Sequence, residues 1–230
     1  MIGVWANGLA VALGGLLGCL LKGGLKEKYR ETVNHALALA VICIGMGGAL
    51  KTENTLLVIV SLVLGSLAGE ALALEAKLDA LGQFAQRKLG RGDIGFAAGF
   101  VNMALLVCVG AMAVVGSLEA GLQNKPDTLL AKALIDGVAA VIFASTFGVG
   151  VCFAAIPLTL YQGGIALLAG VLSPLLTDAL VRELSATGSV LIIGIGLNML
   201  GVTKERIRVG NMLPAVLVPC LWAAVSGMFS

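Results

Sequence analysis

Two acidic residues lie within apolar stretches long enough to cross a bilayer, and they are the first candidates for chemistry. Glu70 lies in the segment GSLAGEALALE, and Asp136 lies in KALIDGVAA. A carboxylate is unfavourable in hydrocarbon, so such a residue usually faces a cavity, the bundle interior or an opposite charge. Both side chains could bind a cation. The structural alternative is an ion pair, which Asp136 can form with Lys132 one turn earlier and Glu70 with a basic group of a cytoplasmic loop.

Uncharged polar residues inside the apolar stretches form a second set of candidates. Asn7, Gln162 and Asn198 stand out because they lie in parts of the chain that resemble one another. A side-chain amide needs a hydrogen-bonding partner away from water. These three residues could therefore bind a solute or ion, or they could join neighbouring helices through hydrogen bonds.

Glycines interrupt the two shortest apolar stretches. Gly45 and Gly47 lie in one of them, and Gly196 lies in the other. Short, glycine-interrupted segments at equivalent positions of a repeat are typical of a transporter site at the membrane midplane, where unwound backbone offers carbonyl groups to an ion or substrate. On this interpretation both helices are discontinuous. The alternative is close packing, because glycine also lets two helix backbones approach each other.

No feature of the sequence points to an enzyme. The chain lacks the GxSxG, HExxH and GxxxxGK motifs of hydrolases, metalloproteases and nucleotide-binding proteins. His35 is the only histidine and the five cysteines are widely spaced, which argues against the usual metal cages. We therefore expect no catalytic residues and no cofactor, and the sequence does not decide whether a metal ion binds.

The composition is that of a membrane protein. Hydrophobic residues make up 59% of the 230 residues and charged residues 12%, whereas soluble domains are about one quarter charged. A net charge of +2 gives no reason to expect a nucleic-acid partner. Cutting the apolar runs at charged residues, glycines and prolines predicts an all-α transmembrane bundle of about eight spans. The expected spans are Ile2–Leu21, Val33–Leu50, Leu56–Leu74, Ile94–Gly116, Leu129–Gly150, Ile156–Leu176, Ala186–Gly201 and Val209–Phe229.

The basic residues predict the orientation of these spans, because lysine and arginine accumulate on the cytoplasmic side. With eight spans and both termini outside the cytoplasm, eleven basic residues are cytoplasmic and four are outside. Fusing the fifth and sixth spans would give seven spans, with nine basic residues inside and six outside. The eight-span arrangement separates the charges better.

The second and seventh spans also share a sequence register. Four residues of the second span have counterparts in the seventh: Ile42, Ile44, Gly45 and Thr52 align with Ile193, Ile195, Gly196 and Thr203. The first and sixth spans match more faintly. Equivalent spans five crossings apart run in opposite directions, which predicts an inverted-topology repeat of spans 1–3 and 6–8. The expected division is a first repeat (1–74), an amphipathic cytoplasmic connection (75–93), a central helix pair (94–150) and a second repeat (151–230).

Several motifs, taken in order, resemble the YdfK/YqgA-like family of bacterial integral membrane proteins over essentially the whole chain. They are Asn7-Gly8, the GExxxxExxLxxLG run from Gly69 to Gly82, VGAMAVVGSLEAGL from Val109, KALIDG around Asp136, YQGGIALLA from Tyr161, TGSVLIIGIGLNMLGVTK, and VGNMLPA through Pro214. The resemblance implies a location in the bacterial cytoplasmic membrane. It implies no substrate.

Taken together, these patterns favour a small secondary transporter or ion-coupled carrier of an unknown solute or ion. We expect the lipid bilayer and a second copy of the chain, in a homodimer, as partners. The expected binding residues are Asn7, Gly45, Gly47, Glu70, Asp136, Gln162, Gly196 and Asn198. The alternatives are a channel, which would need a continuous polar pore, and a membrane scaffold that does not transport.

Overall fold

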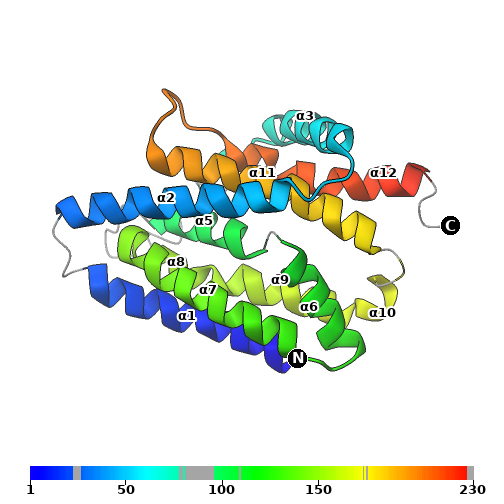
Figure 1. Ribbon diagram of the computed structural model, residues 1–230, viewed down its shortest axis with the longest axis horizontal. Coiled ribbons are helices and arrows are strands. Elements are labelled where there is room, and N and C mark those ends of the chain that lie inside the picture. Colours follow the sequence, from blue (N-terminus) through cyan, green and yellow to red (C-terminus); the bar gives the residue numbers. More distant parts are fainter. Residues whose placement is uncertain are drawn as a thin grey trace. The chain divides into compact units, whose positions relative to one another are not determined.

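The computed structural model describes residues 1–22, 27–77, 80, 96–108, 110–172, 174 and 176–226, and this part of the chain is helical, without a β-strand (Figure 1). The all-α prediction is therefore confirmed. The helices are α1 (Ile2–Lys22), α2 (Glu27–Ala49), α3 (Thr55–Ala71), α5 (Phe96–Cys108), α6 (Ala111–Leu122), α7 (Asp127–Phe147), α8 (Gly150–Phe153), α9 (Ala155–Leu167), α10 (Ala169–Leu172), α11 (Asp178–Leu200), the 3-10 helix η1 (Val209–Leu217) and α12 (Val218–Ser226).

Five described segments are long and apolar enough to cross a membrane by themselves: Ile2–Leu21, Glu31–Ala49, Asp127–Phe147, Gly150–Leu167 and Asp178–Leu200. A sixth crossing is possible if Phe96–Cys108 and Met112–Leu122, which are bent by 61° at their junction, form one span. Gly110 in this bend has φ +143°, a conformation that side chains disfavour. Thr55–Ala71 and Val209–Ala223 are shorter apolar helices, so the predicted count of eight is not established by helix length.

The prediction that the second and seventh spans are discontinuous is wrong. α2 continues through Gly45 and Gly47, and α11 continues through Gly196, each as one helix of 23 residues. Glycine lowers helix stability, but tertiary packing commonly outweighs this preference. Both helices lie against a partner helix at Gly45 and Gly196, so packing is the physical reason for their continuity.

The chain forms two compact units. The first unit comprises Met1–Leu37, Leu78–Cys108 and Met112–Gly170, and the second comprises Ala38–Lys77, Val109–Ala111 and Val171–Ser230. The predicted boundaries of the repeats and of the central helix pair remain a prediction. The predicted amphipathic connection lies largely outside the described residues, because residues 78–79 and 81–95 are not described.

In the first unit α1 and α7 lie side by side and run in the same direction (Figure 1). Gly3 lies next to Leu129, Gly14 next to the carbonyl group of Gly137, and Gly18 next to that of Val141. α9 runs antiparallel to α1, because Gly8 lies next to Thr159 whereas Val4, earlier in α1, lies next to Gly163. The small residues of α1 therefore let two helices approach its backbone closely.

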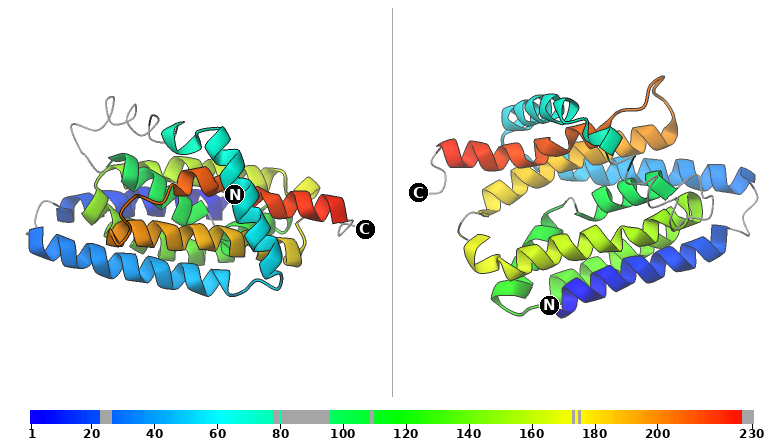
Figure 2. Two further views of the ribbon diagram at one scale, coloured as in Figure 1. Left: turned by 90° about the horizontal axis from the view of Figure 1, so that it is seen from above. Right: turned by 180° about the vertical axis from the view of Figure 1, so that it is seen from behind.

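The second unit contains two antiparallel helix contacts, and Figure 2 shows the elements involved. α2 packs on α11, and α3 packs on η1. Gly65 lies against the backbone of Ala215 and Gly69 against that of Asn211, so the GxxxG pair of α3 serves packing. Pro214 lies inside η1, where its missing N–H removes one hydrogen bond of a regular α-helix.

The exposed surface of α1 is apolar. Trp5, Leu9, Leu13, Leu16 and Leu20 are between 52% and 78% exposed. Water-soluble proteins rarely show a continuous apolar stripe of this kind, whereas a lipid-facing helix surface has no need of polar groups. The exposed side chains therefore agree with a location in a membrane.

Glycine packing gives a first testable prediction. A methyl group at position 69 would overlap the Asn211 carbonyl group, whereas a methyl group at position 47 would meet nothing within 4 Å. Gly69→Ala should therefore lower the thermal unfolding midpoint in detergent. Gly47→Ala should leave it unchanged or raise it, since alanine favours a helix by about 1 kcal/mol over glycine. Tryptophan fluorescence during heating measures both, and equal midpoints would contradict the packing of α3 on η1.

Candidate functional site

A buried polar cluster in the first unit brings together three of the predicted site residues. Asn7 of α1 donates from Nδ2 to Asp136 Oδ2 of α7 at 2.9 Å and to Gln162 Oε1 of α9 at 3.3 Å. Lys132 donates from Nζ to both oxygens of Asp136, at 2.9 and 2.8 Å. Asn7 and Gln162 are fully buried, and Lys132 and Asp136 are 7% and 5% exposed. We call these four residues the polar cluster.

Helix geometry explains how the polar cluster forms. Lys132 and Asp136 are four residues apart in one helix, so their side chains share a face and can meet. The close contacts of α1 with α7 and α9 bring Asn7 between the other two helices. The ion pair proposed from the sequence as the structural alternative for Asp136 is therefore present, and its partner is Lys132.

The polar cluster is not fully satisfied. Asn7 Oδ1 and Gln162 Nε2 are buried atoms without a hydrogen-bonding partner. Leaving a buried amide group unpaired costs about 1–3 kcal/mol. Two such atoms on neighbouring side chains therefore require an explanation.

Glu70 lies at the end of α3 and is bound by the second unit's own residues. It accepts from Arg208 Nη1 at 2.7 Å and from Asn211 Nδ2 at 2.5 Å, and its side chain is 57% exposed. Glu75 accepts from the backbone N–H of Gly210 at 2.6 Å, and its own N–H donates to Asn211 Oδ1 at 2.7 Å. The GExxxxE and VGN motifs therefore contact each other, which favours the structural alternative for Glu70.

Asn198 also has a structural role. It donates from Nδ2 to the Ile207 carbonyl group and accepts at Oδ1 from the Ile207 N–H, both at 2.8 Å. Gly201 ends α11 in the left-handed conformation with φ +66°. Asn198 thus closes the loop that follows α11.

Gly45 and Gly196 mark the contact between α2 and α11. A Cβ atom added to Gly45 would lie 2.7 Å from Ile193 Cγ1, 2.9 Å from Ile193 N and 2.9 Å from Ser189 O. One added to Gly196 would lie 2.5 Å from Ile42 Cγ1, 3.2 Å from Ile42 N and 3.0 Å from Ala38 O. Gly47 faces open space. The predicted glycines therefore divide into two packing positions and one exposed position.

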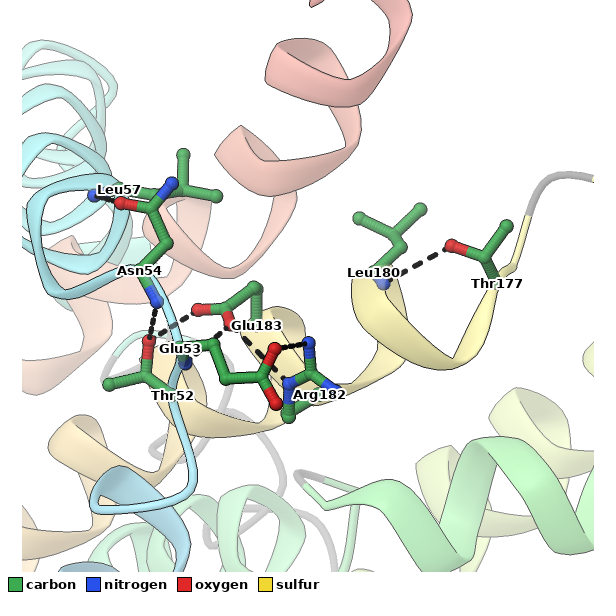
Figure 3. A network of polar contacts seen from close by, with 8 residues as sticks. All are labelled: Thr52, Glu53, Asn54, Leu57, Thr177, Leu180, Arg182 and Glu183. Carbon is green, nitrogen blue, oxygen red and sulfur yellow. Dashed lines mark hydrogen bonds and ion pairs between the residues drawn. The ribbon is translucent and has the colours of Figure 1, made fainter. Parts of the chain in front are cut away.

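Sequence reasoning missed one polar network, which Figure 3 shows at the turn between α2 and α3. Glu183 of α11 is buried and accepts from Thr52 Oγ1 at 2.5 Å and from the Glu53 N–H at 2.9 Å. Arg182 binds Glu53 Oε2 at 2.6 Å. Glu183 was overlooked because VRELSA reads as a polar stretch before the seventh span, and only the fold brings it to the end of α2.

Metal binding finds no support in the described part of the chain, where no three His, Cys, Asp or Glu side chains gather around one point. Of the eight predicted residues, Asn7, Asp136 and Gln162 come together in the polar cluster. Gly45 and Gly196 meet each other's helices, Glu70 and Asn198 are bound by residues of the second unit, and Gly47 faces open space.

Comparison with known proteins gives one consistent result. A family model described as "Protein of unknown function (DUF554)" matches residues 2–224. The uncharacterized membrane protein YdfK of Bacillus subtilis is 31% identical over 223 residues, which cover 95% of this chain and 94% of YdfK. The uncharacterized protein YqgA of Escherichia coli is 32% identical over 225 residues, with 95% and 94% covered. No solved structure matches the chain.

The buried ion pair gives a second prediction. Lys132→Met leaves Asp136 as an unpaired buried charge, and Asp136→Leu leaves Lys132 unpaired. Each single change should destabilise the protein by about 3–5 kcal/mol, whereas replacing both charges by apolar residues is often nearly neutral. The double variant should therefore unfold in detergent at a higher temperature than either single variant. If the two losses add, the side chains are not coupled in this way.

Proposed function

Since the chain belongs to the DUF554 family, and a relative in that family is a membrane protein, we propose that it is a small secondary transporter of the bacterial cytoplasmic membrane. In this proposal two inverted repeats form the transporter, and they expose a central site alternately to each side. The proposal extends to a homodimer, because a bundle of short helices has little interior in which to enclose a pathway.

The reciprocal packing of Gly45 and Gly196 carries the proposal. The sequence register that aligns Gly45 with Gly196 also aligns Ala38 with Ser189 and Ile42 with Ile193. Each glycine is approached by the same three atoms of its partner helix, namely Cγ1 and N of the isoleucine and the carbonyl oxygen of the residue four positions earlier. Such a match is what a pseudo-two-fold axis through the contact would produce. Because the two helices are antiparallel, that axis would lie in the membrane plane.

The same register has a second consequence at the end of α2. It relates Thr52 to Thr203, Glu53 to Lys204 and Arg182 to Glu31. Glu53 and Arg182 form an ion pair. The residues related to them by the register, Lys204 and Glu31, also carry opposite charges, with the signs exchanged. This agreement is independent of the glycines and supports the repeat.

Helix direction supports eight crossings. Because α1 and α7 are parallel, an odd number of crossings must separate them if both span the membrane. With α2 as one crossing, α3 and the bent α5–α6 pair must either both cross or both stay on one side. If neither crossed, the four basic residues from Lys77 to Arg91 would move outside, leaving seven basic residues inside and eight outside. The rule of cytoplasmic positive charge therefore favours eight crossings.

Transport itself is tested in proteoliposomes. One set of vesicles reports Na⁺, K⁺ and H⁺ movement through entrapped dyes, and another reports entry of acetamide, urea and glycerol through light scattering. A carrier should accelerate at least one of these fluxes over protein-free vesicles, and the flux should saturate with concentration. A flux that rises linearly with solute concentration would indicate a channel. The absence of flux in every assay would contradict the proposal that the protein is a transporter.

The orientation gives a separate prediction. Lys125 and Lys204 are both exposed, and they lie in loops assigned to opposite sides. On a background without native cysteines, Lys125→Cys should react in intact cells, after access through the outer membrane where there is one, with a maleimide that cannot cross the cytoplasmic membrane. Lys204→Cys should react only after that membrane is opened. The reverse pattern would invert the orientation, and labelling of both in intact cells would contradict the odd number of crossings, three in the eight-span arrangement, between the two loops.

A further inference from the structure

Two buried amide atoms of the polar cluster lack a hydrogen-bonding partner. Asn7 Oδ1 is an acceptor and Gln162 Nε2 is a donor, and both are buried without a partner. Buried polar groups in folded proteins nearly always have a partner, whether protein, water or ligand. A group that both donates and accepts would satisfy the two atoms together.

Exchanging the oxygen and nitrogen positions of the Asn7 and Gln162 amides does not give the unpaired atoms a partner. Asp136 is an acceptor for Lys132 and Asn7, and an ionised carboxylate has no proton to donate. Asn7 must therefore direct its NH₂ group toward Asp136, and Gln162 must direct its oxygen toward that same NH₂ group. The ion pair thus fixes which atom of each amide stays unpaired.

Charge excludes ions as the preferred ligand. Lys132 and Asp136 neutralise each other within the polar cluster, and both are almost fully buried. A cation would have to displace the Lys132 ammonium group from Asp136, and an anion would have to displace Asp136 from Lys132. Breaking such a buried pair is strongly unfavourable. An uncharged ligand leaves the pair intact.

The backbone beside Gln162 leaves space. A methyl group added to Gly163, the residue that follows Gln162, would meet only Val4 Cγ1, at 3.8 Å. On the other side of the α1–α9 contact, by contrast, Gly8 packs tightly against Thr159. The part of α9 that carries Gln162 is therefore more loosely packed than the rest of this contact.

We propose that the polar cluster binds a small uncharged solute with a hydrogen-bond donor and acceptor, of the amide, urea or polyol class. The solute donates to Asn7 Oδ1 and accepts from Gln162 Nε2, while Lys132 and Asp136 hold Asn7 in the required orientation. This inference rests on the proposed transport function and replaces its unspecified cargo by a chemical class.

Stopped-flow light scattering of proteoliposomes tests the inference with acetamide, urea and glycerol as probes. The wild-type protein should accelerate entry of at least one probe, and an excess of a second probe on both sides should slow it by competition. Gln162→Met removes the donor with little change in volume and should reduce the flux by about tenfold, the equivalent of one lost hydrogen bond. Gln123→Met, at an exposed position, is the matched control and should leave the flux unchanged.

The competition measurement needs no variant, so it tests the proposed solute class even if Gln162→Met fails to fold. If none of the neutral probes is accelerated while Na⁺, K⁺ or H⁺ moves, the inference is overturned and the carrier proposal stands. If nothing moves, both are overturned. A probe flux that Gln162→Met leaves at the wild-type level would reject the polar cluster as its site and assign the unpaired atoms to a structural water.

Discussion

A polar group that is removed from water must find its partner within the chain, and this constraint explains most of the described contacts. The carboxylate of Asp136 binds Lys132 and Asn7, that of Glu183 binds Thr52 and a backbone N–H, and that of Glu75 binds the Gly210 N–H. Each is mostly buried and each is matched. Among the described residues six buried side-chain atoms lack a hydrogen-bonding partner, and Asn7 Oδ1 and Gln162 Nε2 are the two that belong to side chains hydrogen-bonded to each other.

Glycine determines where these partners can meet. Hydrocarbon supplies no hydrophobic force between helices, so association in a membrane depends on close packing and hydrogen bonds. Gly14 and Gly18 let α1 approach α7, and Gly65 and Gly69 let α3 approach η1. The side-chain hydrogen bonds between these helices follow from that approach, since Asn7 and Asn211 act at the same contacts. Packing by small residues and polar recognition are thus parts of one arrangement.

The sequence predicted the helical class and most helix positions, because apolar length is a strong signal in a membrane protein. It also brought Asn7, Asp136 and Gln162 into one candidate site, and the structure places these three together. The sequence did not predict features that depend on which residues are neighbours in the folded chain. Glycine-rich helices can be unwound or tightly packed, and only the neighbour of Gly45 and Gly196 decides between them. Glu183 and the exposed position of Gly47 likewise depend on neighbours distant in sequence.

The two polar networks of the second unit each contain contacts that differ in the free energy needed to break them. The two antiparallel helix pairs, α2–α11 and α3–η1, are joined by hydrogen bonds at opposite ends. Glu183 forms them where α2 meets the start of α11, and Glu75 forms them where α3 ends against η1. Each of these networks combines a mostly buried carboxylate with an exposed ion pair. The ion pair is Glu53–Arg182 at one end and Glu70–Arg208 at the other. Exposed pairs contribute about 0–1 kcal/mol, so they open with little loss. The buried carboxylates must exchange protein N–H donors for water, and that step costs more. If the unit opens at one end during transport, the energy barrier therefore lies at Glu183 or Glu75, whereas the packing of Gly45 and Gly196 between those ends can persist.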